Sequence, residues 1–336
     1  MSQDYNTKGI LVRGFLNNIA LKYQNSEMSY VTDRVLPIIG GLNKEAKVYK
    51  YSRADAFRSE AGVRAPGGAA PIAETRASAV NLDPVNYSIG KKITDELRQQ
   101  ATAPGNYNLN PDVNAVNYCM DQIMMKREKE FSSILHGTTW ADGVSGGEDA
   151  AAGWGNATEA SDTMVDDLAA GESKIVSETG KRPNTLLLDF PAWQNIKKSP
   201  FWLNKLNNTQ FAGNITPEAI AQTLNYNIII GWGVENTAPE STDQDAFTSK
   251  YILSADAASN LKGNAFLFYR PSAPAIDELS VGYQYRLRKP ASGLDIALYR
   301  MRDDIHFSDI IVAEQEFDIA PMVVEAGYHW KNTAVA

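Results

Sequence analysis

The feature that most limits the possible folds is a long extended stretch, residues 47–93, with almost no apolar bulk for a core of its own. Residues 47–57 and 77–93 alternate apolar and polar side chains in places, which is typical of β-strands. Residues 60–71 (EAGVRAPGGAAP) lie between them and predict a mobile tip. Because a two-stranded ribbon is only marginally stable alone in water, we expect it to lie on something else, most simply another subunit.

A single long helix is predicted over residues 111–137. Asn110 is a good N-cap, Pro111 suits the first helical position, and Gly137 can end the helix. Apolar side chains recur between these ends at helical spacing, and a helix of this length forms a rod of about 40 Å. The charged run at residues 126–130 (KREKE) usually indicates a solvated face, but it could equally meet a neighbouring chain.

The rest of the chain is predicted to contain a compact α/β unit followed by long strands. The first fifty residues are irregular, and residues 138–160 form a Gly- and Ala-rich loop. The α/β unit combines predicted helices at 161–179, 191–198 and 216–226 with short buried strands at 184–189 and 227–231. Longer strands are predicted after Pro271, at 279–288, 294–302 and 310–319.

Composition excludes several classes of protein. A chain of 336 residues with 43% hydrophobic and 21% charged side chains can bury a core, in about two domains. Its net charge of −8 argues against a general nucleic-acid binder, because binding to phosphate backbones depends on clustered Lys and Arg. The single cysteine, Cys119, excludes a disulfide framework and multi-cysteine metal sites. The three histidines, His136, His306 and His329, are too few for most histidine-based metal sites.

Targeting signals are not evident either. No stretch approaches the roughly 18 consecutive apolar residues that a membrane-spanning helix needs. The first residues lack the basic and apolar regions of a secretory signal, so we expect the protein in a reducing cytosol.

One catalytic pattern matches literally. Residues 143–147 (GVSGG) fit the G-x-S-x-G elbow, in which a strand-to-helix turn presents a nucleophilic serine. The residues before Ser145 do not form a buried strand and those after it make a poor helix start, so a flexible loop is the better interpretation. A cytosolic serine hydrolase using Ser145 remains an alternative of a different class. We predict no catalytic, cofactor-binding or metal-binding site, and no cofactor.

The order of these elements resembles the major capsid proteins of tailed bacteriophages, the Hong Kong 97-type fold. The likeness covers nearly the whole chain and rests on the order and spacing of several short segments. These are 30–39 (YVTDRVLPII), similar to the family's arm; 64–68 (RAPGG), the extended-loop tip; 87–96 (YSIGKKITDE), leading into the spine helix; 126–130, its charged end; and 179–188 (TGKRPNTLLL), the axial core.

The resemblance implies an α+β fold in which the second domain is inserted between parts of the first. The implied parts are an N-terminal arm (1–46), an extended β-ribbon loop (47–93), a peripheral domain (94–145) with spine helix 111–137, an α/β axial domain (146–270), and return strands of the peripheral domain with the C-terminus (271–336).

The implied function is structural, with no enzymatic activity. A major capsid protein self-assembles as pentamers and hexamers into an icosahedral shell that encloses phage double-stranded DNA without sequence-specific binding. The implied partners are further copies of the chain, a separate scaffolding protein, a portal and, where the shell needs one, a decoration protein, with no membrane. The implied location is the virion, assembled in the bacterial cytoplasm. An encapsulin-like nanocompartment shell is the alternative on the same fold.

The ribbon carries the candidate contact residues. Arg53, Arg58, Arg64 and Arg76 could pair with acids of an adjoining subunit, although exposed arginines also simply keep a loop soluble. Some members of the family join their subunits through a lysine on this loop. Residues 51–90 contain no lysine, so we predict no such cross-link and a shell held non-covalently or by a decoration protein.

Overall fold

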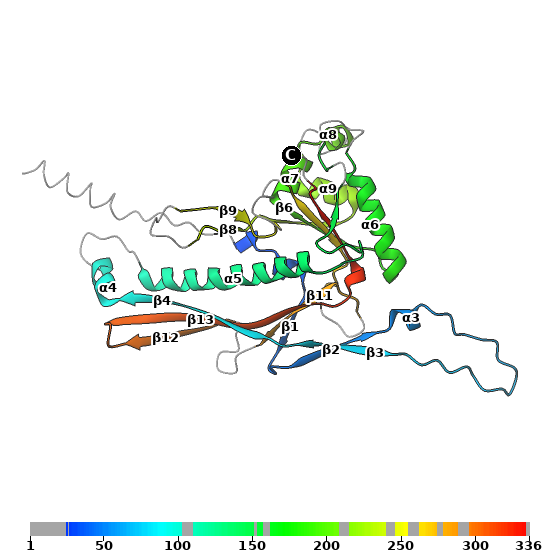
Figure 1. Ribbon diagram of the computed structural model, residues 1–336, viewed down its shortest axis with the longest axis horizontal. Coiled ribbons are helices and arrows are strands. Elements are labelled where there is room, and N and C mark those ends of the chain that lie inside the picture. The colour runs from blue at the N-terminus through cyan, green and yellow to red at the C-terminus, as the bar shows by residue number, and fades with distance from the viewer. Residues whose placement is uncertain are drawn as a thin grey trace, which may run out of the picture.

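The computed structural model contains two five-stranded sheets that meet at one end of a long helix (Figure 1). The mixture of helices and sheets confirms the predicted α+β class. The structure describes residues 25, 27–102, 110–150, 153–156, 162–207, 215–239, 246–254, 262–273, 278–287 and 296–333. Among these residues, no helix is both long and apolar enough to cross a membrane.

The first sheet supports the long helix. Its strands are β1 (Ile38–Gly41), β4 (Val85–Thr94), β11 (Gly282–Leu287), β12 (Ala297–Asp303) and β13 (Ser308–Pro321). The long strand β13 pairs with β11 and β12 along one edge and with β4 along the other. Helix α5 (Pro111–Gly137) lies along one face of β4 and β13 (Figure 1), where Ala115 and Cys119 are buried in small apolar clusters with Ile311 and Ala313.

The bounds of α5 confirm the helix predicted over 111–137. The side chain of Asn110 accepts a hydrogen bond from the backbone N–H of Val113 (3.3 Å), and Pro111 occupies the first turn. At the other end, the N–H of Thr138 donates to the carbonyl of Ile134 (3.0 Å). Helix α4 (Asp95–Thr102) lies between β4 and α5 in the chain.

The second sheet has the order β5–β14–β10–β6–β7. Its strands are β5 (Glu148–Asp149), β6 (Thr185–Asp189), β7 (Asn227–Gly231), β10 (Asn264–Phe268) and β14 (Gly327–Lys331), and its helices are α6 (Met164–Thr179), α7 (Phe190–Ile196), α8 (Pro200–Asn207) and α9 (Pro217–Leu224). Leu186 and Leu188 pack toward these helices, while Leu187 packs toward Leu135 of α5. The strand predicted at 184–189 is therefore buried on both faces, as expected.

The last strand lies where the sequence did not place it. Residues 271–336 were assigned mainly to return strands of the peripheral domain, and β11, β12 and β13 do belong to the first sheet. Strand β14, however, pairs with β10 in the second sheet. Tyr328 and Trp330 account for this placement, because both large rings are buried in the cluster beneath α6.

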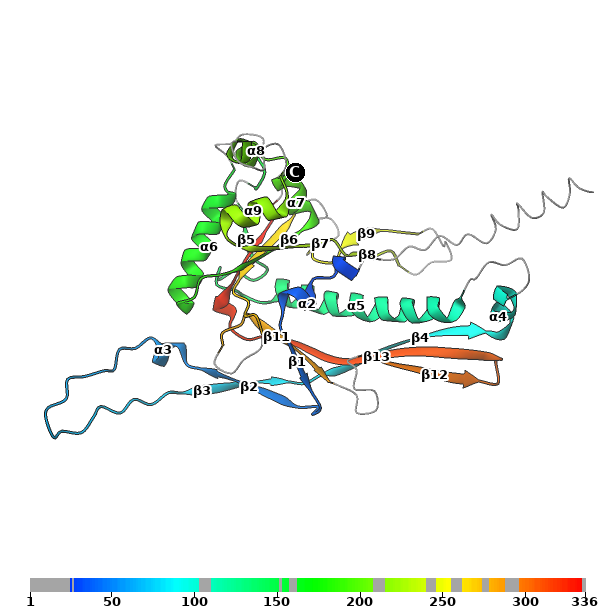
Figure 2. The ribbon, with the colours of Figure 1, turned by 180° about the vertical axis from the view of Figure 1, so that it is seen from behind.

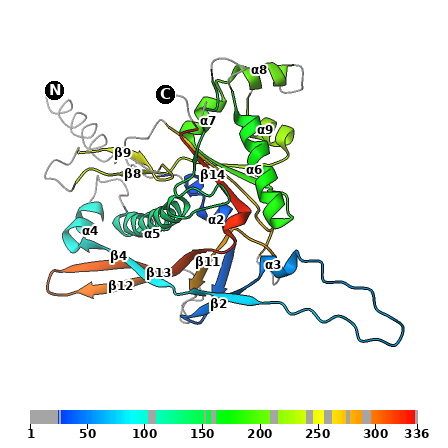
Figure 3. The same ribbon diagram turned by 45° about the vertical axis from the view of Figure 1, so that its right-hand side comes forward.

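The ribbon is shorter than predicted. Strands β2 (Ala46–Tyr51) and β3 (Ala77–Leu82) pair with each other, with the short helix α3 (Arg53–Ala56) following β2. Residues 85–94, expected to continue the ribbon, instead form β4 and pair with β13. The reason is packing: Ile93 is buried against α5, which the ribbon could not provide. The ribbon and its loop project away from the rest of the subunit (Figure 3).

The remaining elements connect these parts. They are η1 (Glu27–Ser29), α2 (Thr32–Val35), the hairpin of β8 (Val234–Asn236) and β9 (Ser249–Tyr251), and η4 (Val324–Ala326). Figure 2 shows α2 next to α5, and the chain continues from α2 into β1 of the first sheet. Residues 30–35, called the N-terminal segment below, therefore lie on α5 before the chain joins the first sheet at β1.

Candidate subunit-contact surfaces

Arg53 holds the base of the ribbon on its own subunit. Its guanidinium lies 2.8 Å from a carboxylate oxygen of Glu178 on α6 and 3.8 Å from Glu325 on η4. Lys50 of β2 lies 3.5 Å from Glu325. The Arg53 side chain is still 49% exposed, so these pairs orient the ribbon base more than they stabilise the fold.

The other predicted contact arginines are spread along the loop and do not form a cluster. Arg76 makes a two-pronged ion pair with Asp55, at 2.7 and 3.0 Å, and its hydrogen bonds hold the pKa of that carboxyl well below its usual range. Arg58 lies 3.7 Å from Glu60. Arg64 makes no ion pair with any described residue. It is therefore the predicted contact arginine with a side chain available to another molecule.

Two apolar surfaces are left uncovered by the subunit. On the ribbon, Val63 and Ile72 are almost fully exposed. On the first sheet, Tyr299 and Met301 lie opposite Val312 and Ile310. These four side chains share the face that does not meet α5, because successive residues of a strand point to opposite faces. In Figure 1 no described element covers that face.

The hairpin that joins β12 to β13 adds two further apolar side chains. Ile305 and Phe307 at its turn are both exposed, and Phe307 has a positive φ of 43°. A bulky residue in that conformation is uncommon. The hairpin therefore extends the uncovered apolar surface of the first sheet to its far end.

An ionic network braces this same end of the first sheet. Its members are three arginines and three aspartates: Arg98, Arg300, Arg302, Asp95, Asp112 and Asp309. Hydrogen bonds from Arg300 and Arg98 lower the pKa of Asp309, and a hydrogen bond from Arg302 lowers that of Asp95. The network joins α4, α5, β12 and β13 at this end of the sheet.

The charged run at 126–130 is divided between two environments. Lys126 and Glu130 form an exposed i,i+4 pair, as a solvated face predicts. Arg127 and Glu128 are buried inside the subunit, which the sequence did not indicate. Arg127 lies 3.1 Å from Asp33 on α2. Two of the five residues of the run, Arg127 and Glu128, therefore bind residues 31–33 of their own chain, within the N-terminal segment.

Glu128 is the main anchor of that segment. Its carboxylate accepts hydrogen bonds from the N–H groups of Val31 (3.1 Å) and Thr32 (3.0 Å) and from the Thr32 hydroxyl. Burial raises the pKa of Glu128, although these donors and Arg127 oppose the shift. Tyr30 adds a hydrogen bond from its hydroxyl to Asp121 (2.8 Å). The carboxylate thus satisfies free N–H groups at the start of α2, which has no side-chain N-cap.

Ser145 does not lie in a nucleophile elbow. It follows α5 in a loop, where it makes an isolated bridge with Thr139, and the next element is the two-residue strand β5. The strand and the helix that would flank a nucleophilic serine are both missing around it. In the described part of the chain, no three His, Cys, Asp or Glu side chains gather as a metal site.

The whole arrangement is similar to a solved phage-related protein and to solved phage capsids. A phage-related protein from Bordetella bronchiseptica is 15% identical and superposes with a TM-score of 0.64 over 98% of both chains. The mature capsid of bacteriophage PhiM1 gives 11% identity and a TM-score of 0.58 over 93% of this chain and 89% of that one. The capsid of cyanophage P-SCSP1u gives 9% and 0.59 over 93% and 90%. The fold is that of the tailed-phage capsid proteins. No family model and no curated protein matches the sequence.

Within this capsid fold, the anchoring of the N-terminal segment is what sequence reasoning missed. Glu128 was read only as part of a charged run, since nothing local distinguishes it from Glu130. A weak signal was available: α2 begins after Val31, a residue that cannot cap a helix, so its free N–H groups needed an acceptor from elsewhere in the chain.

Proposed function

We propose that this chain is a major capsid protein, which self-assembles as pentamers and hexamers into an icosahedral shell around phage double-stranded DNA. The proposal places it in the virion, after assembly in the bacterial cytoplasm. Assembly would use a separate scaffolding protein and a portal, and the role is structural, without substrate turnover.

The observation that carries the proposal is the pair of uncovered apolar surfaces on a capsid fold. The ribbon exposes Val63 and Ile72 on a loop that has no core, and the first sheet exposes Tyr299 and Met301 on a strand with both faces open. Large exposed apolar surfaces on a soluble subunit commonly mark contact sites. Copies of the chain in a closed lattice could bury both kinds of surface at once, so that many modest contacts sum to a stable shell.

The four ribbon arginines fit this proposal to different degrees. Arg64 has a free side chain beside Val63 and is the best candidate for an ion pair with a neighbouring subunit. Arg53 and Arg76 are held by acids of their own chain, so we propose that they set the direction of the ribbon instead. Arg58 has a weaker partner at 3.7 Å and could be shared. Such rim charges contribute register more than affinity.

The negative net charge and the positions of the lysines are compatible with a shell that encloses DNA without binding it tightly. With a net charge of −8, the wall would not bind packaged DNA non-specifically through its overall charge. Lys91, the first lysine after the ribbon loop, lies over the ring of Tyr118 at 4.6 Å, on β4 and away from the tip. This supports a shell without loop-derived cross-links, held by non-covalent contacts or a decoration protein.

Assembly can be tested by electron microscopy and sedimentation velocity of the purified full chain. The wild type should form shells, tubes, or rings of five or six. V63D/I72D should keep the subunit fold, because both side chains lack neighbours, and should lose these assemblies. Val144, exposed on a loop after α5, offers a matched control, since V144D should still assemble. A wild-type chain that stays monomeric at high concentration would refute the proposal.

The same particles separate the rival functions. Shells are purified from infected or expressing cells and their contents are analysed. Shells that contain a folded protein and no DNA would favour the nanocompartment hypothesis. Ser145→Ala tests the hydrolase reading, because it should leave particle formation unchanged. A wild-type chain labelled at Ser145 by a serine-reactive probe would revive that reading.

A further inference from the structure

Two histidines meet where the long helix joins the second sheet. His136 lies in the last turn of α5 and His329 in the middle of β14, with ring centroids 5.1 Å apart. His329 is 0% exposed, and the ring of Phe266 stands against it edge-on at 6.2 Å. The pair therefore links the end of α5 to β14, which lies between β5 and β10 in the second sheet.

The surroundings leave most of the ring nitrogens without partners. Nε2 of His136 lies 3.0 Å from the carbonyl oxygen of Leu253, to which it donates. Nδ1 of His136 and both ring nitrogens of His329 are buried and have no hydrogen-bond partner among the described residues. The backbone of Gly147 comes so close that a Cβ there would lie 2.5 Å from Nδ1 of His329. Space beside that nitrogen is thus filled by protein.

A phenyl ring would fill the His329 site without leaving a buried N–H unpaired, which costs free energy. What histidine adds is the ability to take a proton at neutral to mildly acidic pH. The charges that face the pair would not stabilise that proton. Lys331 on the same strand repels a charge on His329, and Lys250 repels one on His136.

A buried carboxyl group near the pair is only partly engaged, because Oδ2 of Asp142 has no hydrogen-bond partner among the described residues. Asp142 on the loop after α5 accepts a hydrogen bond from the N–H of Val144 (3.1 Å) and faces the backbone N–H groups of Glu148 and His329. Burial raises the pKa of Asp142, so this carboxyl binds a proton more readily in the closed junction than it would in water. A proton on the pair would therefore be accepted best if the two rings moved apart and reached water.

We propose that this junction is an acid-sensitive hinge: proton uptake by the His136–His329 pair separates the end of α5 from β14. The inference concerns the single subunit and does not rest on shell assembly. Burial, and then the neighbouring His136, hold the pKa of His329 well below its ordinary value. Burial likewise lowers the pKa of His136.

Because the pKa values of both histidines are lowered in the closed junction, acid favours the opened state. Above pH 6.5, the ordinary pKa of histidine, neither the closed nor the opened state takes a proton, and the junction keeps its full stability. Below pH 6.5, the opened state binds protons that the closed state does not bind. Each histidine then raises the opened fraction by at most about tenfold per pH unit.

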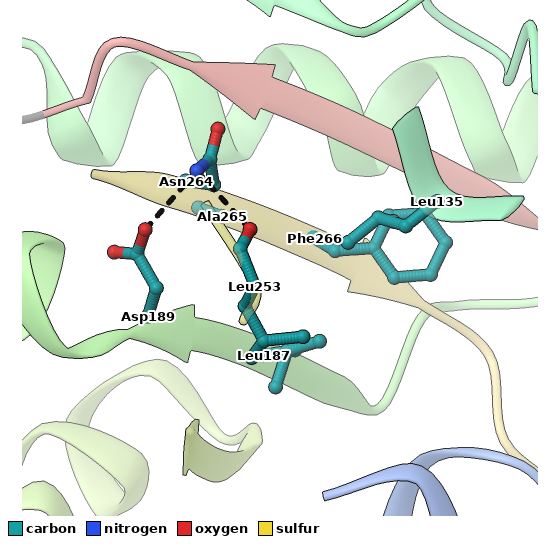
Figure 4. A pocket seen from close by; sticks show the side chains of 7 residues that line it. All are labelled: Leu135, Leu187, Asp189, Leu253, Asn264, Ala265 and Phe266. Carbon is teal, nitrogen blue, oxygen red and sulfur yellow. Dashed lines mark hydrogen bonds between the residues drawn. The ribbon is translucent and has the colours of Figure 1, made fainter. Parts of the chain in front are cut away.

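Two buried acids, Asp142 and Asp189, oppose the histidines. Asn264 donates to Asp189 (3.1 Å) and to the carbonyl of Leu253 (3.4 Å), the oxygen that also accepts from His136 (Figure 4). Burial raises the pKa of Asp189 to about 6, so its protonation favours the closed state as the pH falls below that value. Burial raises the pKa of Asp142 in the same way, so the net gain in opening is largest just below pH 6.5 and shrinks as the two acids take up protons.

Hydrogen exchange of the full chain at pH 7, 6 and 5, corrected for intrinsic rates, tests the hinge. In the wild type, protection of β14 and the last turns of α5 should fall by up to about tenfold between pH 7 and 6, and by less between pH 6 and 5. In H329F this slope should be nearly lost. His306 is an exposed histidine bound to Asp303, and H306Q should behave as wild type. A flat wild-type profile, or equal slopes in wild type and H329F, would overturn the proposal.

Histidine NMR on the wild-type chain gives a second test that does not depend on a variant that folds. The ring of His329 should stay neutral in the closed subunit as the pH is lowered below 6.5. A His329 ring that becomes protonated near pH 6.5 with β14 still protected would refute the hinge, because the closed state would then accept the proton.

Discussion

Replacing Glu128 by alanine should release the N-terminal segment from the long helix. The carboxylate is 1% exposed and accepts hydrogen bonds from two backbone N–H groups, those of Val31 and Thr32, and from the Thr32 hydroxyl. Alanine leaves all of these donors buried and unpaired. Each such donor costs roughly 1–3 kcal/mol, and removal of the buried charge, which burial disfavours, returns part of that loss.

We therefore expect E128A to lower the free energy of unfolding by about 3 kcal/mol. Unfolding entropy is about 2.1 cal/mol/K per residue, so for this chain the loss corresponds to a fall in melting temperature of about 4 °C. Hydrogen exchange should locate the effect, because α2 and the residues before it should lose protection first.

Glu130 is a matched control on the same helix. It forms an exposed pair with Lys126, so E130A should change stability by less than about 0.5 kcal/mol. The glutamine variant E128Q should fall between the two, since its carbonyl oxygen can still accept from Thr32. If E128A melts at the same temperature as E130A and protects α2 equally well, then the buried carboxylate does not anchor the segment.

Three further predictions concern other parts of the chain. Gly155 has a φ of +75°, and a Cβ there would lie 2.1 Å from the backbone oxygen of Asn195. In thermal unfolding, G155A should therefore lower the free energy of unfolding by about 3 kcal/mol or more. G67A, at the open ribbon tip, should lower it by only about 1 kcal/mol. The buried carboxyl of Asp189 has a raised pKa of about 6, so the free energy of unfolding should fall as the pH rises from 4 to 7. D189N should remove up to about 3 kcal/mol of this pH dependence, measured by urea unfolding. Parallel plots of unfolding free energy against pH for the two proteins would contradict this. Assembled particles should run as one band at 36.8 kDa on a denaturing gel, because residues 51–90 lack lysine, and a covalent ladder would contradict this.

The predictable elements are those whose signals are local. The helix over 111–137 could be bounded from Asn110 and Gly137, because a cap acts on the N–H groups of its own first turn. The strand at 227–231 could be placed from its apolar run and its flanking turn residues. Asn225 takes the left-handed conformation that ends α9 just before it.

Elements that depend on distant partners were misplaced or not predicted. Residues 85–94 alternate like the rest of the ribbon, and only contact with α5 and β13 assigns them to the first sheet. Strand β14 follows the return strands in sequence but pairs with β10 of the second sheet. Strand pairing is non-local, so the same alternation is compatible with either sheet until the partners are known.

The sequence by itself determined the class of fold, the long helix and a ribbon without a core. Only the tertiary structure decided which charges are structural. Lys126 and Glu130 remain on the surface, whereas Arg127 and Glu128 are buried because Asp33 and Val31, nearly a hundred positions earlier in the chain, lie against α5. The environment of a charge is set by what packs against it, and neighbours in sequence do not reveal those contacts.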